Sequence, residues 1–261
     1  MNEDIVVSID WLATHGDEVR VVDVRDAWEF DGIGHVPGAV NVPFDRFRSE
    51  AGDEGMLPGK ERWTELMEAA GITTDGRLVA YDDEHGVFAA RFLVTALLYG
   101  HRDLHLLDGD YSAWSRSHET TTETPEPSRA TYQVREPESS PLVDFETVES
   151  ALDTDALIVD TREAWEYEEA HLPGAIQLDW RELVDEGTRG LKPREELESL
   201  LAARGITPDS RIILYCNTAR RISHTYIVLT HLGYEDVGFY EGSLTEWMER
   251  GGPVAEGDPD E

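Results

Sequence analysis

Short apolar runs alternate with amphipathic stretches along both halves of the chain. In the second half, runs at 156–160, 211–215 and 237–240 have the length and β-branched content of strands. Apolar residues at helical spacing predict helices between them, at 195–204 and 223–232. Strands that alternate with helices predict an α/β fold, built on a mainly parallel sheet flanked by helices.

Punctuating residues mark the ends of several predicted helices. Pro193 suits the first turn of the helix that follows it, and Gly205 suits the C-terminal end of that helix. Ser243, with Glu246 three residues later, predicts a capping box. We therefore expect a further helix to open at Ser243.

The whole pattern occurs twice. The segment 22–30, Val-Asp-Val-Arg-Asp-Ala-Trp-Glu-Phe, returns at 159–167 as Val-Asp-Thr-Arg-Glu-Ala-Trp-Glu-Tyr. A His-x-Pro-Gly-Ala turn likewise stands at 35–39 and again at 171–175, and the period is about 135 residues. A period this long predicts two domains rather than a stack of short repeats.

A polar stretch separates the two copies. Residues 119–141 are rich in Thr, Glu, Pro and Ser and lack apolar periodicity, which predicts an exposed linker. The predicted domains are therefore 1–118 and 142–261, each large enough for a core of its own. Trp114 and Trp247 occupy matching positions near the end of each copy, and we expect both to anchor the core.

The chain is strongly acidic. It carries 55 Asp and Glu against 22 Lys and Arg, for a formal net charge of −33, and its only lysines are Lys60 and Lys192. Nucleic acid and anionic membranes are poor partners for such a surface, because phosphate requires clustered positive charge. An acidic surface suits concentrated salt, which screens self-repulsion, so we hypothesise a halophilic microbe as the source. The N-terminal residues lack the pattern of a secretion signal, and we expect a cytoplasmic protein.

Cys216 is the only cysteine, which excludes an intramolecular disulfide. It follows the apolar run 211–215 and precedes a short turn, after which a helix is expected from Ile222. Ligands of α/β sheets bind where strands end, and the N-terminus of a helix favours anions there. Arg220 and Arg221 add positive charge that would stabilise a thiolate. A lone cysteine is often just a small buried residue, but a core position needs neither the turn nor the arginines.

At this point the chain resembles a tandem rhodanese, a two-domain sulfurtransferase of the thiosulfate or 3-mercaptopyruvate type. The resemblance spans nearly the whole chain and is carried by the order of four motifs. These are Asp-Thr-Arg at 160–162 with Glu-Tyr at 166–167, His-Leu-Pro-Gly-Ala at 171–175, the Tyr-Cys loop at 215–216, and Glu-Gly-Ser at 241–243 with Trp247. The resemblance implies two rhodanese-like domains.

The resemblance also implies a catalytic second domain and an inert first one. Asp82, which is not a plausible sulfur acceptor, stands in the first copy where Cys216 stands in the second. Cys216 would take sulfur from a small-molecule donor as a persulfide and pass it to cyanide or a thiol acceptor. Backbone amides from Asn217, Thr218 and Ala219 to the two arginines would cradle that sulfur, and Arg220 or Arg221 would hold the donor's oxyanion. No cofactor and no metal are implied.

The loop departs from the family pattern. Glycine is common in rhodaneses where Ala219 stands, so a positive φ at this position would strain alanine by about 1 kcal/mol. The loop is nearest to a Cys-x4-Arg variant associated with microbial thiosulfate enzymes, which favours thiosulfate and leaves 3-mercaptopyruvate as the alternative donor.

Two other functions compete with the sulfurtransferase. A phosphatase of the same fold would use Cys-x5-Arg, but position 222 is Ile and Arg221 lies five positions after Cys216. A sulfur carrier or protein-binding module is a second alternative, and a carrier could use the same persulfide. Turnover with small donors and acceptors would separate these functions.

Some polar residues invite a catalytic interpretation without supporting it. Asp160 and Arg162 recur in the inert copy as an identical pair, so we expect a structural ion pair in each copy. His35 and His171 also recur, beside their Pro-Gly turns, and are expected to fix those loops. His224, one turn into the predicted helix, could either tune the thiolate or face the sheet.

Overall fold

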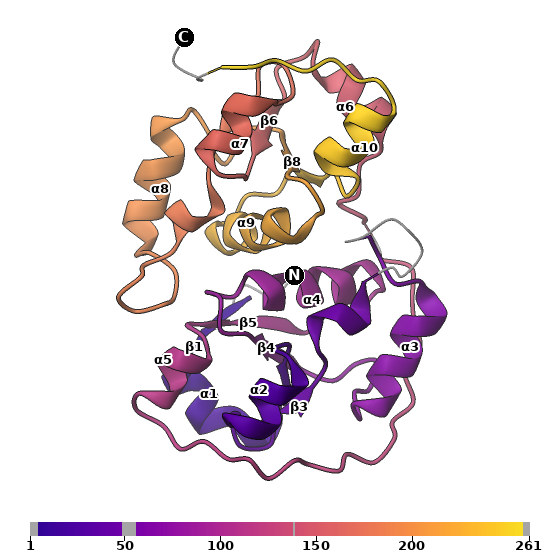
Figure 1. Ribbon diagram of the computed structural model, residues 1–261, viewed down its shortest axis with the longest axis vertical. Helices are drawn as coiled ribbons and strands as arrows, with labels where there is room; N and C mark the ends of the chain where they lie inside the picture. Colours follow the sequence, from indigo (N-terminus) through magenta and orange to yellow (C-terminus); the bar gives the residue numbers. More distant parts are fainter. Residues whose placement is uncertain (1–4, 49–55, 138, 258–261) are drawn as a thin grey trace. The chain divides into compact units, whose positions relative to one another are not determined.

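The computed structural model describes residues 5–48, 56–137 and 139–257. The chain divides into two compact units, Met1–Ser140 with Asp185–Leu191, and Pro141–Val184 with Lys192–Glu261 (Figure 1). Among the described residues, no helix has both the length and the apolar composition needed to span a bilayer.

The first unit is built on a five-stranded parallel sheet, in the order β1-β5-β4-β2-β3. Its strands are β1 (Val6–Ser8), β2 (Arg20–Asp23), β3 (Val40–Asn41), β4 (Leu78–Tyr81) and β5 (Leu104–Asp108). Its helices are α1 (Ile9–His15), η1 (Gly16–Glu18), α2 (Ala27–Gly32), η2 (Phe44–Phe47), α3 (Lys60–Ala69), α4 (Val87–Leu98) and α5 (Tyr111–Ser115). All four residues of central β4 are buried, as expected for a parallel strand covered on both faces.

The second unit repeats this plan with a four-stranded parallel sheet, in the order β7-β6-β8-β9. Its strands are β6 (Leu157–Asp160), β7 (Ile176–Gln177), β8 (Ile212–Tyr215) and β9 (Val237–Phe239). Its helices are α6 (Phe145–Ala151), α7 (Ala164–Glu169), η3 (Trp180–Leu183), α8 (Arg194–Ala203), α9 (Arg220–Leu232) and α10 (Ser243–Glu249). In place of the fifth strand, Leu142 makes an isolated parallel bridge to Phe239.

The predicted α/β architecture with mainly parallel sheets is therefore confirmed in both copies. The two tryptophans are core residues as expected, with Trp114 5% and Trp247 0% exposed. Each indole N–H donates to a backbone carbonyl shortly after its helix, at Glu119 and Pro253 respectively. Burial of the ring together with a satisfied N–H is the arrangement that tryptophan requires in a core.

Two local predictions are wrong. Ser243 does not cap α10, because Gly242 is the N-cap residue and no side chain caps the helix. The stretch between the copies is also not exposed throughout. Tyr132 is 4% exposed, and its hydroxyl lies 3.3 Å from both Trp63 Nε1 and His101 Nδ1. Backbone hydrogen bonds from Ala130 to Glu68 and from Arg135 to Tyr99 also attach this irregular segment to the first unit.

Candidate active site

Cys216 lies directly after β8, at the carboxyl end of a central strand. It is 1% exposed, and the backbone then turns through Asn217, Thr218 and Ala219 into α9. α9 begins at Arg220 rather than near residue 222, so the prediction of a longer loop is wrong and both arginines belong to the first helical turn. The N-terminal end of the helix, which carries the positive end of its dipole, therefore lies at the turn that follows the cysteine.

Ala219 is the N-cap residue of α9 and has φ +63° and ψ −4°. This is the left-handed region, which costs a residue with a Cβ about 1–2 kcal/mol relative to the right-handed one. The conditional expectation of a strained alanine is thus met. The residue is also completely buried, at 0% exposed.

Ser243 lies beside Cys216, and its role was not predicted from the sequence. Its hydroxyl oxygen accepts from the Cys216 backbone N–H at 3.1 Å and donates to the Tyr240 carbonyl at 2.9 Å. It also lies 4.0 Å from the sulfur atom. Ser243 is the first residue of α10 and not its N-cap, and it has a positive φ of 51°. Thr245 reinforces the turn by donating its hydroxyl to the Asn217 carbonyl at 2.9 Å.

A buried carboxylate holds both sides of the loop. Glu166, in the first turn of α7, is 7% exposed and accepts from Asn217 Nδ2 at 2.8 Å. It also accepts from both terminal nitrogens of Arg221, with Nη2 at 3.2 Å from Oε1. Burial alone would raise the pKa of Glu166, but the Arg221 guanidinium and the hydrogen bonds from the Glu163 N–H and the Asn217 amide together outweigh it, and the pKa is lowered. Glu166 is therefore an anion at neutral pH.

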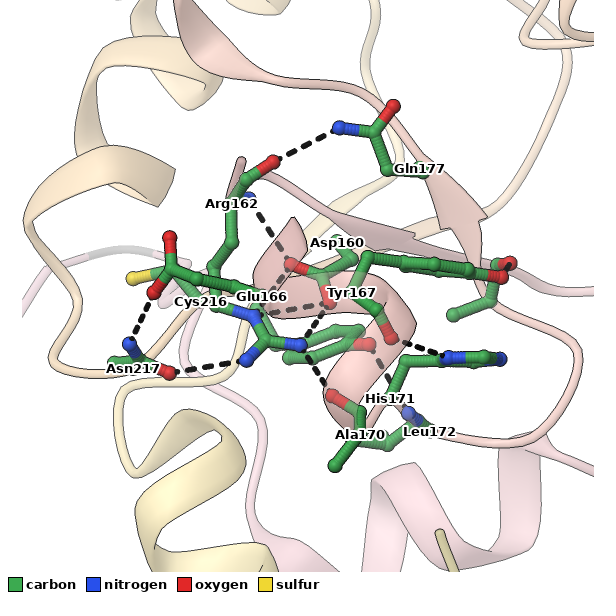
Figure 2. Close-up of polar contacts among 12 residues, drawn as sticks. Asp160, Arg162, Glu166, Tyr167, Ala170, His171, Leu172, Gln177, Cys216 and Asn217 are labelled. Atoms are coloured by element: carbon green, nitrogen blue, oxygen red, sulfur yellow. Dashed lines mark hydrogen bonds and ion pairs between the residues drawn. The ribbon is translucent and has the colours of Figure 1, made fainter. Parts of the chain in front are cut away.

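The predicted structural ion pair extends to this loop from the other side (Figure 2). Arg162 donates to Asp160 through Nε and Nη2, with the shortest contact at 2.6 Å, and both residues are buried. Arg162 also donates to the Ala170 carbonyl at 2.6 Å and lies 3.4 Å from Asn217 Oδ1. The Tyr215 hydroxyl accepts from the Leu172 N–H at 3.0 Å.

The first unit contains the same pair without the loop contact. Arg25 donates to Asp23 at 2.6 Å and to the Gly34 carbonyl at 2.7 Å, and Tyr81 donates to Asp23 at 2.6 Å. Because the arrangement occurs in both units, its basic role is to join the end of a strand to the turn that follows. The structural interpretation of both pairs is confirmed.

The histidines of the Pro-Gly turns also have structural contacts. His35 Nδ1 lies 2.9 Å from the Phe30 carbonyl, and His171 Nδ1 lies 2.8 Å from the Tyr167 carbonyl. A carbonyl oxygen only accepts, so Nδ1 carries the proton in each case. His224 of α9 is fully buried, and its ring meets that of Trp180 edge-on at 5.2 Å.

The remaining predicted residues differ in exposure. Asn217, Arg220 and Arg221 are half-buried, whereas Thr218 is exposed. Arg220 and Arg221 are adjacent on α9, and it is Arg221 that pairs with Glu166. The structure thus brings Cys216 and Arg221 to one turn, held by Glu166 and Ser243, neither of which was predicted as a site residue.

The corresponding loop of the first unit binds an anion of its own. Asp82 follows β4 as Cys216 follows β8, and its carboxylate is 1% exposed. Oδ1 accepts from the backbone N–H groups of Glu84 and Gly86, both at 2.8 Å. Oδ2 accepts from Phe88 at 2.7 Å and Ala89 at 2.9 Å. Burial raises the pKa of Asp82, and these four N–H groups oppose the rise. This loop is an anion cradle occupied by the residue that replaces the cysteine.

Comparison with known proteins gives a consistent result. Residues 8–117 and 144–250 each match the family described as "Rhodanese-like domain". A "Thiosulfate sulfurtransferase" of Pseudomonas aeruginosa is 32% identical, with 88% of each chain covered, and the "Sulfur carrier protein TtuD" of Thermus thermophilus is 31% identical, with 98% of each covered. The crystal structure of SseA from Escherichia coli, described as a 3-mercaptopyruvate sulfotransferase, superposes with a TM-score of 0.82 at 27% identity, over 92% of this chain and 98% of that one. The chain belongs to the rhodanese family, with one rhodanese-like domain in each half.

Proposed function

We propose that this protein is a sulfurtransferase that moves sulfane sulfur from thiosulfate to cyanide or a thiol through a persulfide on Cys216. The observation that carries the proposal is the Asp82 cradle of the first unit. There the loop between the equivalent strand and helix donates four backbone hydrogen bonds to an anion. A loop of this design after β8 would receive a thiolate or persulfide in the same way.

The N-caps of the two helices align the loops. Gly86 caps α4 with φ +85°, and Ala219 caps α9 with φ +63°, both in the left-handed region. Counting onwards from the caps, the donors Phe88 and Ala89 correspond to Arg221 and Ile222. We therefore assign the amides of Ala219, Arg221 and Ile222 to the sulfur cradle of the second unit. The positive end of α9, a helix of 13 residues, would add to the stabilisation.

The proposed reaction has two displacement steps at sulfur. The Cys216 thiolate attacks the outer sulfur of thiosulfate, a sulfur–sulfur bond forms, and sulfite leaves with the electron pair of the bond that breaks. Cyanide or a thiolate then attacks the outer sulfur of the persulfide, and the Cys216 thiolate leaves. Arg220 or Arg221 would hold the sulfonate oxygens of the donor and then the departing sulfite, because a guanidinium offers forked donors to oxyanions.

Two small molecules are candidates for the sulfur donor, thiosulfate and 3-mercaptopyruvate. The Cys-x4-Arg spacing and the thiosulfate sulfurtransferase of Pseudomonas aeruginosa favour thiosulfate. The similarity to the 3-mercaptopyruvate protein of Escherichia coli supports 3-mercaptopyruvate as the alternative. With that donor the Cys216 thiolate again attacks the sulfur atom of the donor, but the leaving group is the enolate of pyruvate instead of sulfite.

A carrier role is the second candidate, favoured by the similarity to the sulfur carrier protein of Thermus thermophilus. A carrier would accept sulfur at Cys216 and hand it to a protein, so it would form the persulfide yet turn over slowly with cyanide. A phosphatase role has less support, because Arg221 lies five positions after Cys216 and Glu166 already occupies two of its nitrogens.

Intact mass spectrometry tests the proposal. The native chain and Cys216→Ser are incubated with thiosulfate, and separately with 3-mercaptopyruvate, in high-salt buffer. We expect a gain of one sulfur atom on the native chain, lost on adding cyanide and absent in Cys216→Ser. No adduct with either donor would refute the proposal, and an adduct that resists cyanide would favour the carrier.

A further inference from the structure

The carboxylate of Glu166 contacts three elements around the loop. Besides Asn217 and Arg221, its Oε2 lies 3.3 Å from the Glu163 backbone N–H, in the capping box of α7. One buried carboxylate therefore connects α7 to Asn217 in the loop and to Arg221 in α9. Displacing Glu166 would release both sides of the turn at once.

Glu166 occupies the end of the Arg221 side chain. Its two oxygens contact Nη1 and Nη2, which is the forked, bidentate arrangement. A guanidinium has five N–H groups, so three remain, on Nε and on the outer sides of the terminal nitrogens. In the described part of the chain, Glu166 is the hydrogen-bond acceptor of this side chain, and the other three N–H groups meet none. An oxyanion can reach Arg221 only through this remaining edge.

Arg221 lies in the first turn of α9, directly after the loop that carries Cys216. Burial lowers the pKa of Arg221, but the hydrogen bond to Glu166 and the charges of Cys216 and Glu166 raise it above its ordinary value. Arg221 thus interacts electrostatically with both Glu166 and Cys216. Charge that Glu166 offsets is not available to stabilise the thiolate or to attract a donor.

The first unit shows that the fold does not require this arrangement. Glu29, the counterpart of Glu166, accepts from the Asp26 backbone N–H and completes the capping box of α2. The position that corresponds to Arg221 is Phe88, which cannot form an ion pair. Capping is therefore common to both units, whereas the contact with the loop is specific to the unit that contains Cys216.

We propose that Glu166 is a positioning residue that fixes Arg221 and offsets its charge, so that the site presents one edge of a partly neutralised guanidinium to an anionic donor. The identity of the anionic donor rests on the proposed function, whereas the effect of Glu166 on Arg221 does not. The consequence is a site that binds small oxyanions weakly and lets sulfite leave. It also holds the Cys216 thiolate with less than the full charge of Arg221.

Glu166→Gln removes the charge and keeps nearly the same shape, and its single oxygen can stay at the position that accepts from the Glu163 backbone N–H. Cys216 alkylation by iodoacetamide, a neutral reagent, is followed by intact mass at constant high ionic strength from pH 5 to pH 10. We expect the alkylation profile of Glu166→Gln to move to lower pH, with about fivefold more reactive thiolate at a given pH on the acid side. Glu29→Gln is the matched control and should leave the profile in place.

Two further measurements exclude a purely structural effect. Glu166→Asp keeps the charge on a shorter side chain, so its profile should return towards the native one. Sulfate, an unreactive oxyanion, should protect Cys216 from alkylation at about fivefold lower concentration in Glu166→Gln than in the native chain. An unchanged profile, a shift to higher pH, or an equal shift in Glu166→Asp would overturn the proposal. Alkylation needs no sulfur donor, so this result is independent of whether Cys216 takes sulfur from thiosulfate.

Discussion

Asp82→Asn tests whether the first unit depends on its internal anion. Each carboxylate oxygen accepts two backbone N–H groups, and asparagine can satisfy only the pair that faces its single oxygen. The other pair would face an NH2 group and lose its acceptor in a buried site. Leaving a buried donor unsatisfied costs about 1–3 kcal/mol, so the loss of two gives an expected destabilisation of about 2–6 kcal/mol for the first unit.

The assay must report on one unit at a time, because a chain of two domains need not unfold in one step. Hydrogen exchange measured by mass spectrometry in increasing urea gives a local free energy of opening for peptides covering β4 and α4, and separately for β8 and α9. We expect the loss in the first pair and little change in the second. Asp45→Asn, at an exposed position of η2, is the control. A loss below about 1 kcal/mol at β4 and α4 would refute the view that the carboxylate anchors the loop.

Four further predictions concern the second unit and the surface. Ala219→Val should lower the free energy of unfolding by about 2 kcal/mol or more in urea titrations, since it puts a branched residue at φ +63° in a buried site, whereas Ala219→Gly should be tolerated. Arg162→Met should cost about 3–5 kcal/mol in the same assay by leaving Asp160 buried without its partner, and a cost below 1 kcal/mol would contradict the pairing. Arg221 depresses the pKa of Glu166, so the ionised carboxylate stabilises the fold above its unfolded-state pKa, and this stabilisation is lost as pH falls through the folded-state pKa. Between pH 7 and pH 3, the free energy of unfolding of Glu166→Gln should therefore fall less than that of the native chain. The melting temperature should drop when potassium chloride is reduced from about 2 M to about 0.1 M, given a net charge of −33, and an unchanged value would refute adaptation to salt.

Local patterns in the sequence were enough to predict the elements that carry the site. The apolar run that ends at Tyr215 forms β8, and the repeat placed Asp82 and Cys216 at equivalent strand ends. These inferences succeed because burial determines which residues of one strand or helix are apolar, and that pattern can be recognised within a few consecutive residues. The positive φ at Ala219 was also foreseeable, because alanine stands at a position where rhodaneses commonly have glycine.

Contacts between distant residues were beyond the same reasoning. Glu166 and Arg221 are 55 residues apart, and a glutamate in the first turn of a helix is fully explained by capping, as Glu29 shows. Ser243 fitted a capping box equally well, yet its hydroxyl bonds to a residue 27 positions earlier. In each case a local role satisfied the pattern, and only the three-dimensional arrangement revealed the second one. The sequence did contain one signal of the ion pair: Arg221 in the second copy corresponds to Phe88 in the first, although the glutamate is present in both.

The internal carboxylate of the first unit has a consequence for how the two loops behave in concentrated salt. A ligand attached to the chain does not have to be captured from solution, so its effective concentration exceeds that of any free competitor. Chloride at molar concentration would therefore not displace Asp82 from its four amides. The amides of the Cys216 loop would also receive a tethered group, the thiolate, but the oxyanion of the donor reaches this loop from solution and must compete with every dissolved anion. Of two related loops, one is saturated at all salt concentrations, while the occupancy of the other depends on the medium.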